Sequence, residues 1–372
     1  MQKEQKKLTE RTIEKECSIF MTCGGCPYYQ LPYPRREEQK KQSIREFLSQ
    51  NQLSLPVAIT HLGFFGLRDR FDLQYQNGVF GLYAQGSQDI VAMPRCPKIH
   101  PILNQALQWL NAHPLPIERA ALRLRRSPQK KVGLWIDASH PTVHQLMTEQ
   151  TWLTQASKQF LIEIGQKHKR LIRKTSKWGL HKHPQLEPWF ETPISTEKKT
   201  PLYTTIAGFT QPSMRINTEL VLYVQGLVHA ISAQHWLEYG CGAGNFSFML
   251  SQNCETLDLI EISPLAKKGL QKGLSHLPNH AQIQFLTSCS ESSCTAILVD
   301  PPRSGMGTNL SSIYQHPTIR DIIYVSCNIQ SLIHDMRIVF EHGYELRSIH
   351  GVNQFPRSTH CEWIAHLSKS KS

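Results

Sequence analysis

From residue 201 onward, short apolar runs alternate with longer amphipathic runs, and each apolar run ends in a polar or glycine-rich turn. Short apolar runs bounded by turns are typical of buried strands, and amphipathic runs are typical of helices. Their alternation predicts a doubly wound α/β sheet, because parallel strands need helical crossovers. The strands are predicted at 235–239, 257–262, 283–286, 296–299, 322–326, 344–350 and 363–366, and the longest helices at 216–232 and 329–340.

The stretch Tyr324-Val325-Ser326-Cys327-Asn328 places a cysteine at the end of one of these strands. Open α/β sheets bind their ligands at the carboxyl ends of the strands. The helix predicted to begin at Ile329 also puts Cys327 near a helix N-terminus, where the partial positive charge favours a thiolate. Most free cysteines are small buried core residues, so the hypothesis that Cys327 is a nucleophile depends on its neighbours.

A glycine-rich turn, Gly240-Cys241-Gly242-Ala243-Gly244-Asn245, follows the first predicted strand. Such a turn, with an acidic residue about 20 positions later, is typical of a site that binds the ribose of a nucleoside, and Glu261 is that residue here. The turn lacks the last glycine of the dinucleotide-binding fingerprint, since Phe246 follows Asn245. S-adenosylmethionine is therefore favoured over NAD, and a packing turn without any ligand is the alternative.

The motif Asp300-Pro301-Pro302-Arg303 follows another strand, and its prolines stiffen the loop. Methyltransferases of amino groups with a similar motif usually carry an aromatic residue where Arg303 stands, so a different target atom is indicated. C5 of uracil is such a target, because it becomes nucleophilic once a thiolate adds at C6. This chemistry needs a cysteine with a lowered pKa, a cation near the developing negative charge and a base for the C5 proton. The sequence offers Cys327, Arg303 and Glu362 for these roles.

The chain is basic, because Lys and Arg exceed Asp and Glu by 41 − 29 = 12 in 372 residues. This charge predicts a polyanionic partner such as nucleic acid. Two basic runs, 125–131 and 167–174, are predicted to contact RNA phosphates, with an ordinary solvated surface as the alternative. No run is long and apolar enough to span a membrane, and the charged N-terminus lacks a secretory h-region. We therefore expect a cytoplasmic protein without a membrane partner.

The chain contains 10 cysteines, which in a cytoplasmic protein indicate metal binding or catalysis rather than disulfides. Cys17, Cys23 and Cys26 lie close together in the sequence and can surround one soft metal centre. Cys96, in Pro94-Arg95-Cys96-Pro97, is the best candidate for a fourth ligand. A compact trio with one distant cysteine favours a [4Fe–4S] cluster. Zinc, or cysteines without any ligand, are the alternatives.

Three domains are predicted along the chain. Residues 1–53 are expected to form a solvated tail, the cluster-binding segment and an exposed charged helix at 34–51. Residues 54–200 are expected to form a central α+β RNA-binding domain that supplies Cys96. Its hairpin is predicted at 71–83, because Asn77-Gly78 separates two alternating runs, while the pattern is ambiguous between 142 and 178. Residues 201–372 are expected to form the domain that binds S-adenosylmethionine.

The motifs described above are similar to those of the RNA uracil-5 methyltransferases, which use S-adenosylmethionine to form 5-methyluridine in ribosomal or transfer RNA. The resemblance covers nearly the whole chain. The motifs that carry it occur in the same order and at fitting intervals. They are Phe209-Thr210-Gln211-Pro212, Cys241-Gly242-Ala243-Gly244-Asn245-Phe246, Asp300-Pro301-Pro302-Arg303, Ser326-Cys327-Asn328, and Phe355-Pro356 with His360-Cys361-Glu362.

The resemblance implies a class I methyltransferase sheet, with Cys327 as the nucleophile and Glu362 as the general base. It also implies a [4Fe–4S] cluster on the N-terminal cysteines, as in the subgroup typical of ribosomal RNA enzymes. The residues that it places around S-adenosylmethionine are Gln211, Gly240, Asn245, Glu261 and Asp300.

The sequence departs from the family pattern at three points. Gly240 stands where relatives usually have the Tyr or Phe that stacks on adenine. The segment before Cys17 is too short for the small β-barrel RNA-binding domain of many relatives, so RNA binding is expected to depend on the central domain. The motifs at 209–212 and 244–247 resemble the transfer RNA enzymes, which lack the cluster.

We therefore expect a monomeric enzyme that methylates uridine C5 in 23S ribosomal RNA. Transfer RNA as the substrate is one alternative. A non-catalytic iron–sulfur protein that binds RNA is the other.

Overall fold

The computed structural model describes residues 17–278 and 281–369, so the tail expected at residues 1–16 lies outside the described residues. The chain forms two compact units. Unit 1 contains the described residues up to Tyr33, together with Gly63–Trp189 and Thr205–Gly208. Unit 2 contains Pro34–Leu62, Phe190–Thr204 and the described residues from Phe209 onward.

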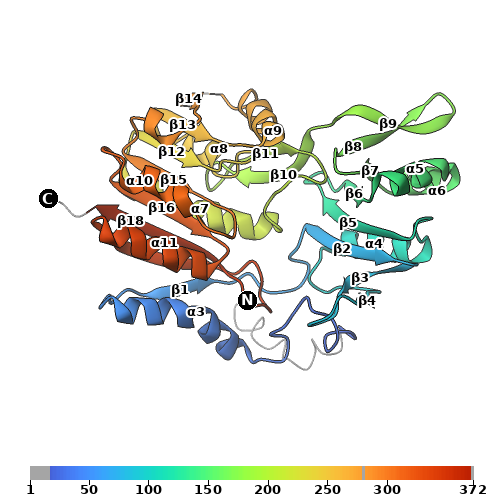
Figure 1. Ribbon diagram of the computed structural model, residues 1–372, viewed down its shortest axis with the longest axis horizontal. Helices are drawn as coiled ribbons and strands as arrows, with labels where there is room; N and C mark the ends of the chain where they lie inside the picture. The colour runs from blue at the N-terminus through green and yellow to red at the C-terminus, as the bar shows by residue number, and fades with distance from the viewer. Residues whose placement is uncertain (1–16, 279–280, 370–372) are drawn as a thin grey trace. The chain divides into compact units, whose positions relative to one another are not determined.

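Unit 2 is built on a mostly parallel sheet, whose eight described strands have the order β1-β17-β18-β16-β15-β12-β13-β14 (Figure 1). Neighbouring strands are parallel, except that β18 runs antiparallel to both β16 and β17. The α/β sheet expected from the alternating pattern is thus present. The strands are β1 (Val57–Thr60), β12 (His235–Tyr239), β13 (Thr256–Ile260), β14 (Gln282–Phe285), β15 (Ala296–Val299), β16 (Asp321–Ser326), β17 (Tyr344–Val352) and β18 (Glu362–Lys369).

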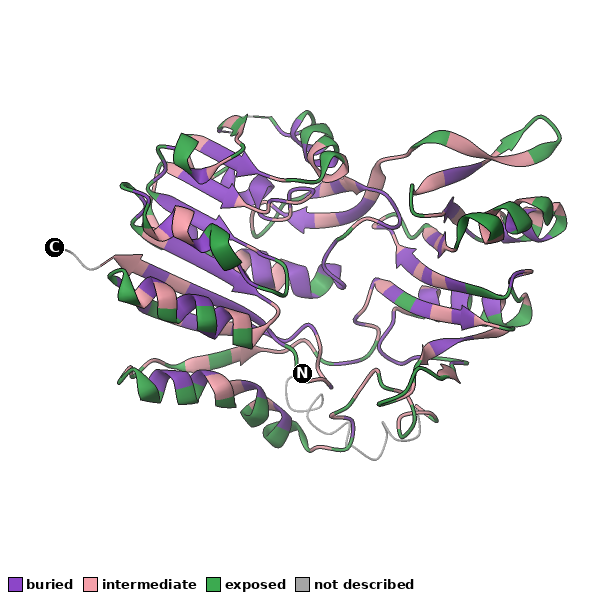
Figure 2. Ribbon diagram, viewed as in Figure 1, coloured by how far each residue is buried: buried purple, intermediate pink, exposed green. Residues whose placement is uncertain are grey.

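The central strands of this sheet are buried along their length, as the purple ribbons in Figure 2 show. Strands covered on both faces need continuous apolar runs, and all four residues of β15 are buried. The helices and 3-10 turns of unit 2 are α3 (Tyr33–Gln50), α7 (Met214–Ile231), α8 (Ser247–Leu250), α9 (Pro264–Leu274), η1 (Cys289–Glu291), η2 (Gly307–Leu310), α10 (Ser311–Tyr314) and α11 (Ile329–Glu341). Among the described residues, no helix is long and apolar enough to cross a membrane.

The helix α3 belongs to unit 2, although the sequence pattern assigned it to an N-terminal segment. Its charged residues hide an apolar face, because Ile44, Phe47 and Leu48 are buried in one core cluster with α11 and the strands. The following strand β1 extends the sheet by pairing in parallel with β17. Residues 34–62 therefore complete unit 2 rather than unit 1, which contains the four cysteines predicted to bind a metal cluster.

Unit 1 contains a second sheet, whose eight described strands have the order β4-β3-β2-β5-β6-β7-β8-β9. The predicted hairpin forms between β2 and β3, with Asn77 and Gly78 at positive φ angles of 48° and 87°. The strands are β2 (Arg70–Gln76), β3 (Val79–Tyr83), β4 (Ile90–Ala92), β5 (Arg119–Arg126), β6 (Val132–Asp137), β7 (Leu161–Ile164), β8 (Lys169–Lys174) and β9 (Lys177–Pro184).

The helices of unit 1 include the segment whose pattern was ambiguous. Residues 142–178 contain most of two short helices followed by β7, β8 and the start of β9. Neither short helix reaches the length at which a helical period becomes distinctive. Both are held by packing, since Leu146 and Leu153 are completely buried in the core of unit 1. The helices are α4 (Pro101–Ala112), α5 (His140–Thr148) and α6 (Gln150–Ala156).

A four-residue segment, Thr205–Gly208, belongs to unit 1 although the residues on both sides belong to unit 2. We call it the strap. It follows the hairpin of β10 (Glu187–Pro193) and β11 (Lys199–Thr204). Arg125, which is 1% exposed, donates to Thr205 O across 2.9 Å and to Gly208 O across 2.5 Å.

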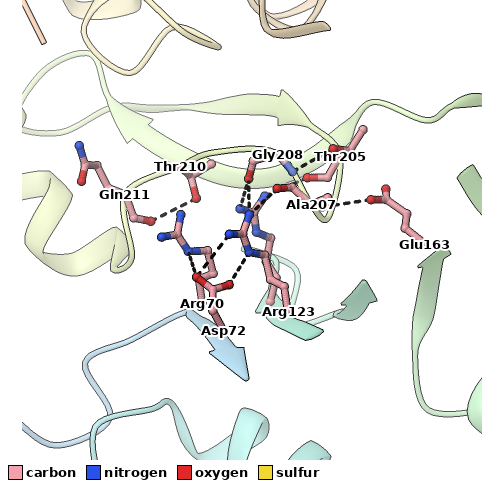
Figure 3. A network of polar contacts seen from close by, with 10 residues as sticks. Arg70, Asp72, Arg123, Glu163, Thr205, Ala207, Gly208, Thr210 and Gln211 are labelled. Atoms are coloured by element: carbon pink, nitrogen blue, oxygen red, sulfur yellow. Dashed lines mark hydrogen bonds and ion pairs between the residues drawn. The ribbon is translucent and has the colours of Figure 1, made fainter. Parts of the chain in front are cut away.

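A second arginine of β5 also holds the strap. Arg123 donates to Ala207 O, and its Nε lies 2.5 Å from Asp72 Oδ1, so its guanidinium group lies between the strap and a carboxylate (Figure 3). Glu163 Oε2 accepts from the Ala207 N–H at 3.1 Å. The basic run at 125–131 is thus partly structural, because its first arginine is buried and Arg126 pairs with Asp69 at 2.8 Å.

Candidate active site

The predicted site residues of unit 2 gather at one edge of its sheet. The parallel strands β12, β13, β15 and β16 all end there, and the residues that follow them are Gly240, Glu261, Asp300 and Cys327. The antiparallel strand β18 begins at the same edge with Glu362. Ser326 pairs with Trp363, so Cys327 and Glu362 emerge from neighbouring strands at corresponding positions.

The glycine-rich turn after β12 needs glycine at Gly240, Gly242 and Gly244, whose φ angles are 77°, 56° and 104°. A Cβ added at Gly240 would lie 3.2 Å from Asp300 O, so this turn packs directly against the loop after β15. A Cβ added at Gly242 would meet no atom within 4 Å. The turn therefore leaves open space beside the backbone, as a nucleoside pocket requires.

Glu261 is fixed by two backbone amides at the start of this open space. Its Oε2 accepts from the Gly242 N–H at 2.7 Å and its Oε1 from the Ser263 N–H at 2.6 Å. Each carboxylate oxygen has a second acceptor position, so both oxygens can still accept hydrogen bonds from ribose hydroxyls. The arrangement fits the role predicted for Glu261.

Asn245 supplies unused polar atoms to the same region. Its Nδ2 and Oδ1 are buried and have no hydrogen-bond partner among the described residues. Buried side-chain amides are rarely left unpaired in both atoms, so a polar ligand is the natural partner for this one. The residues around the turn thus fit S-adenosylmethionine.

Two residues next to this turn and Glu261 were missed in the sequence. Glu238 lies in β12 with 1% exposure, accepts from Ser247 Oγ at 2.5 Å, and has its pKa raised to about 8 by burial. The sequence did contain a signal for Glu238, because it is an acid inside an otherwise apolar strand just before a glycine-rich turn. Ile262, next to Glu261, is 93% exposed. The periodicity of the sequence did not predict that this large apolar side chain would be so exposed.

Arg303 and Asn328 flank Cys327. Arg303 is close enough to the thiol to lower its pKa, and Asn328 Nδ2 donates to Arg303 O at 2.8 Å. Asn328 also caps α11, because its side chain accepts from the Gln330 N–H at 3.1 Å. The cap that begins the helix therefore also holds the loop of Arg303 against Cys327.

The pKa of Cys327 differs from the expectation. Burial raises the pKa of the thiol, and the nearby carboxylate of Glu362 raises it further. The charge and hydrogen bond of Arg303 lower it only in part. The predicted lowering is therefore wrong for the protein alone, since desolvation outweighs the arginine.

Glu362 is 3% exposed, and burial followed by the charge of Asp300 raises its pKa. Burial likewise raises the pKa of Asp300. Two carboxyl groups taken out of water close to each other hold protons more tightly than they would in solution. This is the electrostatic setting in which a carboxylate becomes a stronger base.

A buried carboxylate fixes the loop that carries Arg303. Asp335 Oδ2 accepts from the Met306 N–H at 2.9 Å and from the Tyr324 hydroxyl at 2.5 Å. Tyr324 lies in β16, and Asp335 lies in α11. The strand and the helix on either side of Cys327 are thus tied to the same loop.

The four cysteines singled out in the sequence meet in unit 1. Cys17, Cys23 and Cys26 lie within interaction range of one another, and Cys96 lies within range of Cys17 and Cys26. Burial is the main cause that raises the pKa of Cys96, to about 11. All 10 cysteines are among the described residues, and none of these is in a disulfide.

The backbone around these cysteines is closely held. Asn104 of α4 clamps Cys96 by accepting from its N–H and donating to its C=O, both at 2.9 Å. A Cβ on Gly24 would lie 2.9 Å from Tyr83 O, so only glycine lets the cysteine loop approach β3 this closely. Within the described ranges, no group of three His, Cys, Asp or Glu side chains is close enough to hold a single metal ion.

Comparisons with known proteins indicate the class of protein. A profile of the family described as tRNA (uracil-5-)-methyltransferase matches residues 281–370. An uncharacterized RNA methyltransferase of Bdellovibrio bacteriovorus is 29% identical over 96% of this chain and 96% of its own length. The 23S rRNA (uracil(1939)-C(5))-methyltransferase RlmD of Vibrio campbellii is 25% identical over 98% of this chain and 84% of its own length.

Among solved structures, a tRNA (uracil-54, C5)-methyltransferase of Pyrococcus abyssi, in complex with S-adenosyl-L-homocysteine, has the same fold. Its TM-score is 0.68 at 17% identity, covering 93% of this chain and 86% of that chain. The sheet order, the antiparallel β18 and the glycine-rich turn define an α/β methyltransferase. The sequence relatives narrow the class further. Over nearly its whole length the chain is thus similar to RNA uracil-5 methyltransferases, and the complex of the Pyrococcus abyssi enzyme with S-adenosyl-L-homocysteine indicates S-adenosylmethionine as the methyl donor.

Proposed function

We propose that this enzyme methylates C5 of a uridine in 23S ribosomal RNA through a covalent bond between Cys327 and C6 of the base. The observation that carries the proposal is the meeting of Cys327, Arg303 and Glu362 at the sheet edge beside the glycine-rich turn. That edge offers a nucleophile, a cation and a buried base together, as C5 alkylation of uracil requires.

In this reaction the Cys327 thiolate adds to C6, and the electrons of the C5–C6 double bond move toward C5 and O4. Arg303, whose charge already acts on the thiol, would stabilise this negative charge. Bound S-adenosylmethionine would supply an electrophilic methyl group, to which C5 would bond with S-adenosylhomocysteine as the leaving group. Glu362 then takes the proton from C5, the double bond re-forms, and Cys327 leaves as a thiolate.

The residues proposed to hold S-adenosylmethionine surround the open space described above. The turn at Gly240 lets the backbone approach the ligand, while Glu261 would accept from the ribose hydroxyls. Asn245 would satisfy its buried amide atoms on the ligand. Gln211, which is 6% exposed, and the half-buried Asp300 would complete the pocket.

Ribosomal RNA is favoured because several curated relatives that match nearly the whole chain act on 23S rRNA by name, among them those of Histophilus somni and Vibrio campbellii. Transfer RNA is the second candidate substrate. It is favoured by the description of the matching family profile and by the motifs at 209–212 and 244–247.

We also propose that Cys17, Cys23, Cys26 and Cys96 hold a [4Fe–4S] cluster in unit 1. The proximity of the four thiols and the clamped backbone of Cys96 support this assignment. In such a cluster each thiolate binds a different iron, so the four sulfurs need not converge on one point. The cluster would tie the N-terminal segment to the loop before α4.

RNA is proposed to bind unit 1 through the β8–β9 hairpin. Arg173, Lys174, Lys177 and Lys182 are exposed on it. The predicted basic run at 167–174 contributes only in part, because Arg170 is buried and lies 3.3 Å from Glu187. A solvent-exposed basic hairpin fits the contacts with phosphates that position a protein on RNA.

The test is nucleoside mass spectrometry on separated ribosomal and transfer RNA from cells with and without this protein. Loss of 5-methyluridine from 23S rRNA alone is expected. Loss from transfer RNA alone would show that transfer RNA is the substrate, and the proposed reaction would stand. No change in either fraction, together with no methyl transfer by the purified protein to either RNA, would refute the proposed function.

A further inference from the structure

Gln354 lies at the reacting edge of unit 2 but belongs to none of the motifs that identified the site. It follows β17, whose last residue, Val352, pairs with Glu362 at the start of β18. The register therefore brings Gln354 to the edge where Cys327 and Glu362 emerge. Its side chain is completely buried.

The amide nitrogen of Gln354 joins two other site residues. Nε2 donates to Gln211 Oε1 at 2.8 Å and to Glu362 Oε2 at 3.2 Å. An amide NH2 has two hydrogens, so both donations can be made at once. With Glu362 ionised, as a base must be, the opposite orientation would place Oε1 against its carboxylate, so the orientation with Nε2 toward Glu362 is the one that fits the role of a base.

We propose that Gln354 is a positioning residue for methyl transfer, which aims the Glu362 carboxylate at the C5 proton and aligns it with Gln211. This inference rests on the proposed function, in which Glu362 is the base. The remaining atom, Gln354 Oε1, is buried without a partner among the described residues. A glutamine with a purely structural role would be expected to satisfy both ends of its amide.

The loop around Gln354 is held independently of its amide. Lys40 Nζ donates to Asn353 Oδ1 at 2.6 Å, to Phe355 O at 2.8 Å and to His360 O at 2.9 Å. Both neighbours of Gln354 are thus anchored to α3. Removing the Gln354 amide should release the carboxylate of Glu362 without releasing the loop.

If Gln354 positions Glu362, replacing Gln354 should slow one particular step of the methyl-transfer reaction. Cys327 adds to C6 without help from Glu362, so the covalent protein–RNA complex should still form. Removal of the C5 proton should slow, and the methylated covalent complex should accumulate. The Gln354 hydrogen bond also lowers the pKa of Glu362, so its loss should raise that pKa and shift the acid limb of the rate profile to higher pH.

The experiment compares Gln354→Met with two other variants. Methionine keeps the length of the side chain and removes the donor. Glu362→Gln is the reference for loss of the base. Gln225→Met is the matched control, because Gln225 is a buried glutamine of α7 that donates to Ile194 O at 3.2 Å.

For Gln354→Met we expect kcat to fall by about 10²-fold, as for a catalytic group displaced by about 1 Å. The KM for RNA should fall together with kcat, because the covalent complex accumulates ahead of the slowed step. A covalent complex should appear on denaturing gels, as with Glu362→Gln, and the acid limb should move to higher pH. Gln225→Met should match the wild type in all four readouts.

Wild-type kcat and pH profile in Gln354→Met, with Glu362→Gln impaired, would overturn this inference and leave the proposed function intact. Full turnover in Glu362→Gln would instead overturn the assignment of the base. If Gln354→Met unfolds below the assay temperature, Gln354→Asn replaces it, because its shorter amide cannot reach both partners and the same outcomes apply.

Discussion

The ammonium group of Lys40 lies 2.6 Å from Asn353 Oδ1, which joins helix α3 to the loop that follows β17. The two residues are 313 positions apart in the sequence. Lys40 is 5% exposed and also donates to two backbone carbonyls of the same loop. The segment near the N-terminus of the chain thus shapes the loop that leads to Glu362.

Lys40→Met should therefore destabilise unit 2 and lower activity. Its loss leaves buried acceptors without a donor, which should cost about 2–4 kcal/mol of the free energy of unfolding. Urea unfolding and steady-state methyl transfer measure the two effects. Arg45→Met on the same helix is the control, because Arg45 is exposed and pairs with Glu38, which is exposed as well. Equal effects from both variants would refute the role of Lys40.

The rate should rise with pH through the neutral range. The thiol of Cys327 and the carboxyl of Glu362 both have raised pKa values, and both react in their deprotonated forms. The reactive fraction of each therefore grows as pH increases. Single-turnover methyl transfer at constant ionic strength checks this. A profile that is already flat just above the ordinary carboxyl pKa of about 4.3 would contradict it.

Replacement of Cys96 should remove the proposed cluster. Cys96→Ser deletes one of four thiolates, so protein purified without oxygen should lose iron and acid-labile sulfide relative to the wild type. Cys254→Ser is the control, since Cys254 lies in unit 2 and donates to Leu250 O. Unchanged iron in Cys96→Ser, or zinc in place of iron in the wild type, would rule out the cluster as assigned.

Neutralising the β8–β9 hairpin should weaken RNA binding in a salt-dependent way. Lys174→Gln with Lys177→Gln should reduce the slope of log K against log salt by about 1 for each lysine removed. Filter binding to a 23S rRNA fragment over a range of salt concentrations measures this. Lys158→Gln, an exposed lysine of unit 1 outside the hairpin, should give a smaller change. An unchanged slope in the double variant would exclude the hairpin as a phosphate contact.

Much of unit 2 could be predicted, because buried parallel strands leave continuous apolar runs and their carboxyl ends share an edge. The sequence therefore predicted that Glu261, Asp300 and Cys327 follow strands at the same edge of the sheet. Local patterns do not report long-range pairing, so the contribution of α3 and Lys40 was not foreseen. Gln354 was missed for the same reason, since its partner Gln211 is 143 positions away.

The raised pKa of Cys327 shows a second limit. The sequence indicated that an arginine and a helix N-terminus lie near Cys327, and both of these favour the thiolate. Desolvation depends on how the whole edge packs, and it outweighs those effects. Similarly, the basic run at 125–131 gave no sign that Arg125 would be buried against the strap.

The most direct test of the central claim uses RNA that carries 5-fluorouridine, in which fluorine replaces the C5 proton that Glu362 would remove. The protein is incubated with this RNA and S-adenosylmethionine, digested, and analysed by tandem mass spectrometry. The account predicts a methylated fluorouridine attached to the peptide that contains Cys327. Attachment at any other cysteine, or methylated nucleoside released without an adduct, would contradict it.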